Sequence, residues 1–235
     1  MIYVTSALRW LIGLPLAALA LLSITLMAMV LPMKIYNRPG RALLRGLVRL
    51  FGGRVRVEGL EQVDPAKGYL FMSNHVSLFD IPVLGGYIPN LARGLQAAEQ
   101  FNWPIVGWFL RAIGNIPISR KNARASWASM QRAAQIIKNG TSVIILPEGT
   151  RTRTGGLSEF KKMPFHFAKM ADVPIVPIGL SGLYQFKNRG SWLVRPGLIK
   201  VRFGRPIPVE QIAGCKVDEL RLLVRERISE MIETP

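Results

Sequence analysis

The sequence predicts an α/β fold: a mixed, largely buried β-sheet flanked by helices, preceded by an N-terminal membrane-associated helical hairpin. Three observations lead to this prediction. From about Val55 onward, short β-rich runs alternate with segments of helical periodicity. Before them, Leu11 to Met33 form an uncharged run of 23 residues. A basic segment of amphipathic character joins these two parts of the chain.

Six runs supply the strands of the predicted sheet. Several are almost continuously apolar, which is typical of strands that are covered on both faces. We predict strands at residues 54–59, 69–73, 115–119, 142–147, 174–180 and 198–204. We predict helices between and after them at 78–88, 104–113, 122–138, 162–171 and 216–232. This alternation indicates one layered α/β domain.

The composition indicates an ordered chain with a basic surface. Of the 235 residues, 49% are apolar and 19% are charged, which excludes a disordered chain and suffices for a substantial core. The single cysteine, Cys215, excludes an intramolecular disulfide and a cysteine-rich zinc site. The formal charge of +17 favours a polyanionic partner, either nucleic acid or an anionic membrane surface.

The uncharged run predicts a membrane-inserted helix. Its 23 residues are long enough to cross a hydrocarbon core of about 30 Å. No acidic residue occurs before Glu58. Basic residues stand before the run at Arg9 and after it at Lys34, Arg38, Arg41, Arg45 and Arg49. If the run spans, the positive-inside rule places the rest of the chain in the cytoplasm. We therefore expect a protein of the inner or plasma membrane with its globular part on the cytoplasmic face.

The stretch RPGRALLRGLVRLFGG, residues 38–53, predicts a second helix that lies in the membrane interface. Arginines recur every fourth residue on one helical face and leucines occupy the other, so the arginines would meet lipid phosphates. These arginines are Arg41, Arg45 and Arg49. Breaks at Pro32 and at Pro39-Gly40 would let two helices dip into one leaflet as a hairpin. The alternative is that the second helix packs on the globular domain.

An anionic phospholipid membrane is the partner that these patterns favour. The basic run adjoins the apolar one, and no zinc finger, RNP-like motif or repeat supports binding to nucleic acid. We therefore divide the chain into a membrane-associating segment, residues 1–53, and an α/β domain, residues 54–235.

The stretch SNHVSLFD, residues 73–80, carries one of the two histidines directly after a predicted strand. One interpretation is structural: Ser77 caps a helix, and Asp80 takes the third helical position, as in a capping box. The other interpretation is catalytic: Asp80 accepts Nδ1–H of His75, which leaves Nε2 as a base. The two are compatible, and the spacing alone does not decide between them.

Absent motifs narrow the chemistry that such a base would serve. The sequence has no GxSxG elbow, HExxH motif, P-loop or GxGxxG, and Cys215 has no neighbouring base. A base without a protein nucleophile suggests that the substrate supplies the attacking group. We expect neither a metal nor a resident cofactor.

A second stretch, LPEGTRTRTGG, begins at the end of the predicted strand 142–147. Glycine permits close approach of the backbone and arginine matches the oxygens of phosphate, so Glu148-Gly149-Thr150-Arg151 is a candidate phosphate site. A solvated run of charges is the alternative. Arg120 stands at the end of another predicted strand, in GNIPISR, and is a second candidate.

Four blocks of the sequence resemble, in this order, the motifs of the glycerolipid acyltransferases. They are NH-x4-D, GNIPISR, EGTR and VPIVPIGL. The sequence looks most like the 1-acyl-glycerol-3-phosphate (lysophosphatidate) acyltransferases, over roughly residues 55–210. One block alone would be a weak signal, but four in order are specific. The resemblance implies an α/β fold with a mixed sheet.

The resemblance also implies a reaction. His75 would deprotonate the free sn-2 hydroxyl of 1-acyl-glycerol 3-phosphate, and Asp80 would hold and charge-balance the imidazole. The hydroxyl would attack the thioester of acyl-CoA or acyl–acyl carrier protein, giving phosphatidate without a covalent acyl-enzyme. His75 would then return the proton to the departing thiolate. The acyl thioester is a co-substrate, and no cofactor is implied.

The binding roles that the resemblance implies fall on the other motif residues. The acceptor phosphate would be bound by Arg151 with help from Arg120, in a loop shaped by Glu148, Gly149 and Thr150. The residues that would shape the pocket are Asn74, Ser77, Pro174 and Pro177.

Departures from the family pattern weaken the assignment of lysophosphatidate as the acceptor. Ser119 stands where relatives often carry an aspartate, and Ala97-Ala98-Glu99-Gln100 lacks the usual lysine. One alternative is an acyltransferase for another lysophospholipid or a lyso-aminolipid. Another, in a different class, is a non-catalytic basic membrane-binding protein. His166 is expected to be a packed core or rim residue.

Overall fold

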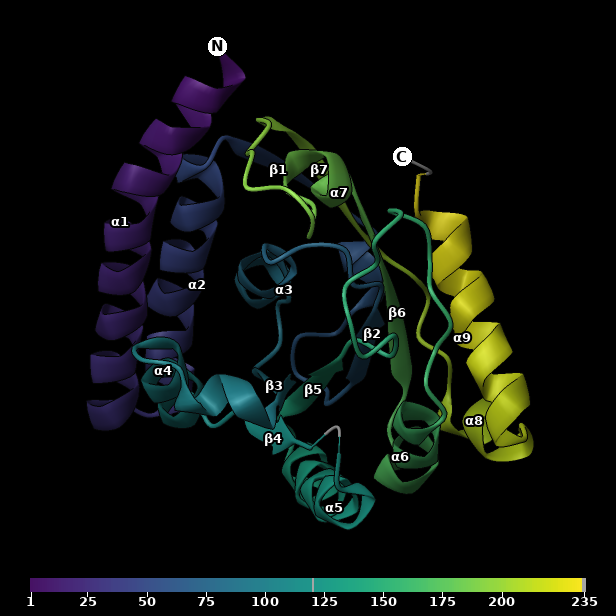
Figure 1. The fold of residues 1–235 in the computed structure, drawn as a ribbon. Helices are drawn as coiled ribbons and strands as arrows, with labels where there is room; N and C mark the ends of the chain where they lie inside the picture. The colour runs from purple at the N-terminus through teal and green to yellow at the C-terminus, as the bar shows by residue number, and fades with distance from the viewer. Residues whose placement is uncertain (120, 234–235) are drawn as a thin grey trace.

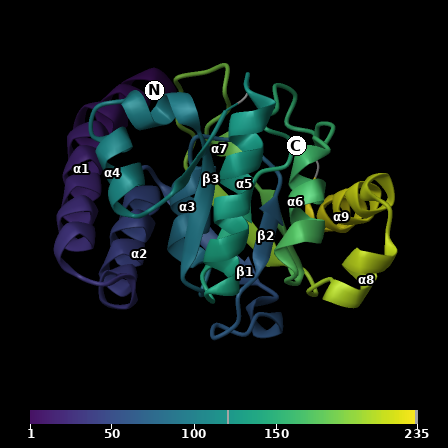
Figure 2. The same cartoon turned by 90° about the horizontal axis from the view of Figure 1, so that it is seen from below.

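The computed structural model describes residues 1–119 and 121–233 and has the α/β architecture that the sequence predicts. A seven-stranded sheet forms the middle of the molecule, and helices cover both of its faces (Figure 1, Figure 2). The strands are β1 (Gly53–Glu58), β2 (Leu70–Ser73), β3 (Ala92–Ala97), β4 (Ile116–Ile118), β5 (Ser142–Ile145), β6 (Ile175–Ser181) and β7 (Gly197–Phe203). The α-helices are α1 (Ile2–Val30), α2 (Met33–Leu50), α3 (Asp80–Tyr87), α4 (Val106–Ala112), α5 (Ala123–Lys138), α6 (Met163–Ala171), α7 (Leu183–Phe186), α8 (Val209–Gly214) and α9 (Val217–Met231). Two short 3-10 helices are η1 (Leu60–Gln62) and η2 (Ala98–Asn102).

The strands of the sheet finish at two opposite ends, because they do not all run in the same direction. The strand order is β1-β7-β6-β2-β5-β3-β4, and neighbouring strands are parallel except for the antiparallel pair β6 and β7. The five strands from β2 to β6 therefore finish together, at what we call the β2 end. The strands β1 and β7 finish at the opposite end, which we call the β7 end.

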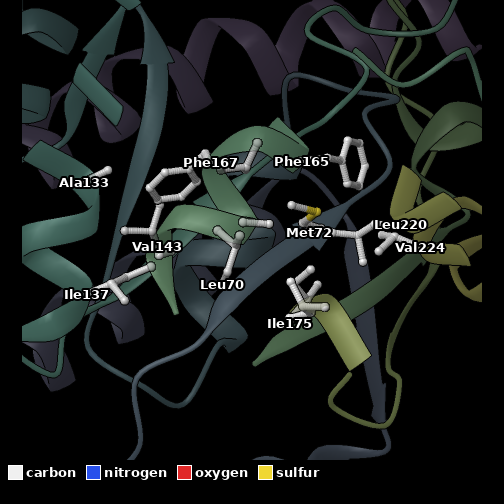
Figure 3. Close-up of a cluster of buried hydrophobic side chains, with 14 of the residues drawn as sticks. Leu70, Met72, Ala133, Ile137, Val143, Phe165, Phe167, Ile175, Leu220 and Val224 are labelled. Carbon is white, nitrogen blue, oxygen red and sulfur yellow. The ribbon is translucent and has the colours of Figure 1, made fainter. Parts of the chain in front are cut away.

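One face of the sheet is covered by α5, α6 and α9, and Figure 3 shows buried side chains between these layers. Leu70 and Met72 of β2 point to this face, where Phe165 and Phe167 of α6 pack in the same cluster. Phe71, between them in sequence, belongs to the cluster on the other face. All five side chains are fully buried. The continuous apolar run of β2 is therefore explained by cover on both faces.

The other face of the sheet is covered by α2, α3 and α7. Val48 of α2, Val83 of α3 and Phe186 of α7 share a buried cluster with Phe71. α2 thus contributes to the core of the α/β domain, which is the packing alternative considered from the sequence.

Two arginines of α2, Arg41 and Arg45, bond to the protein, and the prediction that they meet lipid phosphates is wrong for these two. Arg41 Nη1 donates to the carbonyls of Ile88 and Pro89, both at 2.9 Å. Arg45 Nε donates to the carbonyl of Gly86 at 2.6 Å. These carbonyls lie at the C-terminal end of α3, where the last groups of a helix lack intrahelical partners and attract positive charge. Arg49 is exposed.

The chain reverses once between α1 and α2, and the predicted break at Pro39-Gly40 does not occur. α2 runs unbroken from Met33 to Leu50 with Pro39 inside it. Gly40 is buried against Ile24 of α1, to which a Cβ at this position would come within 3.7 Å. The two helices lie side by side in Figure 1 and pack closely at this position.

The outward side of α1 is apolar and exposed. Leu11, Leu19, Leu26 and Met29 are 60 to 73% exposed. Of the most apolar stretch of α1, only 22% is buried, and the helix is long enough to cross a membrane. Length, composition and exposure therefore agree with membrane association, in which the exposed side chains would face lipid.

Besides the 3-10 helices η1 and η2, the elements β3, α7 and α8 are absent from the sequence-based prediction. β3 reads ARGLQA and contains no β-branched residue, so it lacks the usual strand signal. α7 and α8 have four and six residues, too few to display helical periodicity. The six predicted strands and the five predicted helices agree with the structure to within two residues at each end.

Candidate active site

The register of the sheet brings His75 and Glu148 together at the β2 end. Met72 of β2 pairs with Ile145 of β5 in parallel, and His75 and Glu148 each stand three positions beyond that pair. The main-chain N–H of His75 donates to Oε1 of Glu148 at 2.7 Å. Loops that follow parallel strands gather at the same end of a sheet, which is where ligands usually bind in α/β proteins.

His75 and Asp80 form a hydrogen-bonded pair. Nδ1 of His75 lies 2.6 Å from Oδ2 of Asp80. The Asp80 carboxylate is fully buried and also accepts the main-chain N–H groups of Val76 and Ser77, at 2.8 to 3.1 Å. A carboxylate that accepts these groups favours Nδ1–H as a donor. Nε2 is then left for a substrate, and His75 lines a cavity.

The prediction that Ser77 caps a helix is wrong. α3 begins at Asp80 with Phe79 as its N-cap residue, so Asp80 is the first helical residue and not the third. The reason is that the Asp80 carboxylate turns back to N–H groups upstream of the helix. Ser77 Oγ instead donates to the carbonyl of Lys187 at 2.6 Å and accepts the N–H of Phe79 at 3.2 Å.

Asn74 holds the end of β2 against β6. Its side-chain amide donates to the carbonyl of Leu180 at 2.9 Å and accepts the N–H of Leu180 at 2.8 Å. Asn74 is buried and is not part of the cavity lining. Asn74 was expected to shape the pocket, and it does so only indirectly, because it fixes the strand end that precedes His75.

Glu148 braces the loops around it. It is 1% exposed, and its two carboxylate oxygens accept the N–H groups of His75 and, at 3.0 Å, Ser158. Burial raises the pKa of the Glu148 carboxyl, and the hydrogen bonds from His75 and Ser158 partly offset that effect. With both oxygens engaged, Glu148 is a positioning residue for the His75 loop. This is compatible with the expectation that Glu148 shapes the phosphate loop, and a part in phosphate binding stays a prediction.

The rest of the predicted phosphate loop lies beside His75. Gly149 has a φ of +70°, a left-handed conformation that glycine adopts without strain. Thr150 and Arg151 line the same cavity as His75. The main-chain N–H of Thr152 donates to the carbonyl of His75 at 2.8 Å. The loop and the His75–Asp80 pair are therefore directly connected.

The cavity has a volume of about 610 Å³ and an uneven distribution of charge. Its cationic lining residues are Lys121, Arg151 and Lys161, whereas Glu148 is the one carboxylate that lines it in the described part of the chain. Apolar side chains from six elements complete the wall: Ile81, Leu95, Ile118, Met130, Ile145 and Met163. The cavity thus combines a base, positive charge and an apolar wall.

Pro174 and Pro177 do not line this cavity, which corrects the prediction that they shape the pocket. β6 runs parallel to β2, so Pro174, which precedes β6, lies at the starting end of these strands, away from His75. Pro177 lines a separate cavity at the β7 end. Arg120 lies outside the described residues, and its role in phosphate binding stays a prediction.

Several cavity residues escaped the sequence analysis. Gln96 and Ala97 lie on β3, the strand that was not predicted, and Trp103 follows η2. Lys187, which does not line the cavity, carries no motif, and its carbonyl comes near Ser77 only through the path of the chain after β6. His166, expected to be packed, is exposed on α6. No cluster of three potential metal ligands occurs within residues 1–119 and 121–233.

Comparison with protein families and curated sequences finds acyltransferases. A family model described as Acyltransferase matches residues 54–181. A chloroplast 1-acyl-sn-glycerol-3-phosphate acyltransferase of Arabidopsis thaliana is 31% identical over 182 residues, 77% of this chain and 49% of that protein. An alpha 1-acyl-sn-glycerol-3-phosphate acyltransferase of Bos taurus is 31% identical over 184 residues, 78% of this chain and 63% of that protein. The chain therefore spans about half to two thirds of the length of these curated relatives.

Comparison with solved structures finds the same architecture. The crystal structure of the 1-acyl-sn-glycerophosphate acyltransferase PlsC from Thermotoga maritima matches with a TM-score of 0.84 and 22% sequence identity. The match covers 98% of this chain and 96% of that one. At this identity the likeness concerns the fold, and it confirms the predicted mixed sheet with flanking helices.

Proposed function

Because the chain belongs to the acyltransferase family, as its four motif blocks predict, we propose that it transfers a fatty acyl group from an acyl thioester to the sn-2 hydroxyl of 1-acyl-glycerol 3-phosphate. The product is phosphatidate. The observation that carries this proposal is the 2.6 Å contact between His75 Nδ1 and Asp80 Oδ2, at the wall of a cavity with cationic lining. A protein that only bound membranes would not need this base.

The reaction follows from the position of the His75 ring. Asp80 holds Nδ1–H, so Nε2 accepts the proton of the acceptor hydroxyl as the oxygen attacks the thioester carbonyl. The new C–O bond gives a tetrahedral intermediate, whose collapse breaks the C–S bond. The proton on Nε2 then passes to the departing thiolate. No protein nucleophile takes part, and the acceptor oxygen ends in the ester.

The acceptor phosphate is assigned to Arg151, because its guanidinium is a planar fork that matches phosphate oxygens. Arg151 lines the cavity with His75, and its loop is tied to the His75 carbonyl through Thr152. The apolar wall formed by six elements supports a site for fatty acyl chains. Base, phosphate site and apolar wall thus match the three parts of a lysophosphatidate acceptor.

Attachment to an anionic phospholipid membrane fits such a substrate. α1 exposes an apolar side, and α4, which packs against α1, begins three residues after Trp103, which lines the cavity. The exposed basic residues of α2, Lys34, Arg38 and Arg49, favour the cytoplasmic face of the inner or plasma membrane. The lysolipid and the product would both stay in the bilayer beside the cavity.

The donor is an acyl thioester, either acyl-CoA or acyl–acyl carrier protein. The mechanism needs only a thiolate leaving group, and it uses no cofactor beyond this co-substrate. The positive charge of the chain suits either donor, since CoA and the carrier protein are both anionic.

The test is a turnover assay with the full chain in phospholipid vesicles. Lysophosphatidate is supplied with acyl-CoA or with acyl–acyl carrier protein, and the lipid product is identified by mass spectrometry. We expect phosphatidate with at least one donor, and none above background from His75→Ala. Absence of phosphatidate with both donors, or equal formation by His75→Ala, would contradict the proposal.

A further inference from the structure

A buried lysine that no acyltransferase motif includes lies next to the candidate active site. Lys187 follows α7, and it is 8% exposed. Its ammonium donates one hydrogen bond, to the carbonyl of Asn188 at 2.8 Å. An ammonium has three N–H donors, and in the described part of the chain no carboxylate lies within 4 Å of this one. Lys187 is therefore a buried cation without an anionic partner.

The segment that carries Lys187 is attached to both sides of the active site. The carbonyl of Lys187 accepts Ser77 Oγ–H at 2.6 Å, which joins it to the His75 loop. Arg189 Nη1 donates to Thr150 Oγ1 at 3.0 Å and to the carbonyl of Arg151 at 3.5 Å. The segment from Lys187 to Arg189 is thus anchored to the base on one side and to the phosphate loop on the other.

Lys187 and Arg151 are two unbalanced cations on segments that Arg189 joins by hydrogen bonds. Burial lowers the pKa of Lys187, and the nearby positive charge of Arg151 lowers it further. Arg151 makes no ion pair with any described residue either. Holding two such charges near each other is unfavourable unless an anion joins them. A phosphate monoester, with a charge of about −1.5 to −2 at neutral pH, is matched by two cations.

We propose that the ammonium of Lys187 is a further ligand of the acceptor phosphate, beside Arg151. The inference rests on the proposed function, because it assigns a second cation to the same phosphate. Lys187 bound to phosphate would form charge-assisted hydrogen bonds with N–H groups that have no acceptor in the protein. Arg189 is then a positioning residue, which holds the loop of Arg151 against the segment of Lys187.

If Lys187 had a purely structural role, its replacement would lower the stability of the protein, whereas a role in ligand binding predicts the opposite. The folded protein carries this ammonium at a cost, so its removal in Lys187→Met keeps the apolar stem and eliminates the cost. We expect a melting temperature at neutral pH that is equal to or higher than that of the wild type. We expect the KM for lysophosphatidate to rise about 10- to 100-fold, with kcat nearly unchanged.

Phosphate binding is also measured without turnover. Inorganic phosphate and glycerol 3-phosphate should raise the melting temperature of the wild type, and this protection should be lost or strongly reduced in Lys187→Met. Arg202→Met, at the cavity of the β7 end, is the matched control: it removes a paired cation far from His75 and should keep both the protection and the KM.

Lys187→Arg keeps the inference testable if the methionine variant fails to fold. Arginine stays charged throughout the accessible pH range, whereas Lys187 with its lowered pKa loses its proton at alkaline pH. The KM of the wild type should therefore rise toward alkaline pH, and that of Lys187→Arg should stay flat.

The results for Lys187→Met and Lys187→Arg distinguish a phosphate ligand from a structural residue. A higher KM and lost phosphate protection without lower stability would support the assignment. An unchanged KM in Lys187→Met, or the same alkaline rise in wild type and Lys187→Arg, would overturn it while leaving the proposed function intact. No phosphatidate and no phosphate protection in the wild type would overturn the proposed function, and this inference with it.

Discussion

Two cavities lie at opposite ends of the sheet, and their cations differ in their partners: Arg202 at one cavity is paired with carboxylates, whereas Arg151 at the other has no such partner among the described residues. At the β7 end, a cavity of about 490 Å³ is lined by Glu58 and Arg202. Arg202 Nε lies 2.8 Å from Glu58 Oε2, and Nη2 lies 2.8 Å from Glu233 Oε1. At the β2 end, Arg151 and Lys187 have no carboxylate partner among the described residues.

The directions of the pKa shifts express the same contrast. The hydrogen bond that Arg202 donates to Glu58, followed by the one it donates to Glu233, raises the pKa of Arg202. Burial and the charge of Arg151 lower the pKa of Lys187. Cations stabilised by the protein itself contribute to the fold, whereas cations that the protein leaves unbalanced need an anionic ligand. The size of a basic cavity therefore says less about function than the partners of its cations.

The largest effect is expected for His75→Ala, which removes the base at the β2 end. The general base contributes about 10²- to 10⁴-fold, so kcat should fall by a factor in that range. Steady-state assays in vesicles measure it, and co-sedimentation with the vesicles should be unaffected. His166→Ala is the matched control, because His166 is exposed on α6 and should leave kcat unchanged. Retained turnover in His75→Ala would refute the assignment of the base.

Arg151→Ala should act next most strongly, and selectively. It removes the guanidinium to which the acceptor phosphate is assigned in the proposal, so the KM for lysophosphatidate should rise about 10- to 100-fold. The KM for the acyl donor should stay constant in the same assays. An effect on the donor alone would mean that Arg151 binds the phosphate groups of the donor and not the acceptor.

Glu148→Gln should affect stability and rate together. The glutamine can present a carbonyl to only one of the N–H groups of His75 and Ser158, and its amide would face the other. Leaving a buried donor unsatisfied costs about 1–3 kcal/mol, which chemical denaturation would detect. kcat should decrease because the His75 loop loses its brace. Unchanged stability would mean that Glu148 is not the positioning residue described here.

The smallest effect is expected at the β7 end, for Arg202→Met. Glu58 and Glu233 have lowered pKa values, chiefly through hydrogen bonds from Arg202 and Lys200 respectively. The pKa values of these two carboxyl groups are lower in the folded than in the unfolded protein. Their ionised forms therefore stabilise the fold above about pH 4.3, and this contribution is lost as the pH falls through their pKa values in the folded protein. The variant should have a slightly lower melting temperature at pH 7, and its melting temperature should fall less steeply as the pH is lowered. A changed KM for lysophosphatidate in this variant would contradict the claim that only the cations at the β2 end bind the acceptor.

Local signals in the sequence were enough for most of the fold, and they raised the pairing of His75 with Asp80 as one of two interpretations. Continuous apolar runs identified the buried strands, and His75 with Asp80 at the end of one of them gave the dyad geometry. β3 was missed because ARGLQA is neither β-branched nor continuously apolar. Its place in the sheet is set by pairing with β5 and β4, which no local pattern reveals.

The roles of individual charges were less predictable, because they depend on partners that are distant in sequence. Arg41 and Arg45 appeared to face lipid, but they bond to carbonyls at the end of α3. Glu148 belongs to the expected phosphate motif, yet both of its oxygens are used by the main chain. Lys187 had no motif at all, and only tertiary structure brings it to Ser77.

The most direct test of the central claim compares two acceptors that differ only at the phosphate. Acylation rates are measured for lysophosphatidate and for lysophosphatidylcholine with the same acyl chain, using the wild type and Arg151→Ala. We predict that the wild type prefers lysophosphatidate and that Arg151→Ala loses most of this preference. Equal rates for both acceptors in the wild type, or a preference that persists in Arg151→Ala, would contradict a phosphate site at the β2 end.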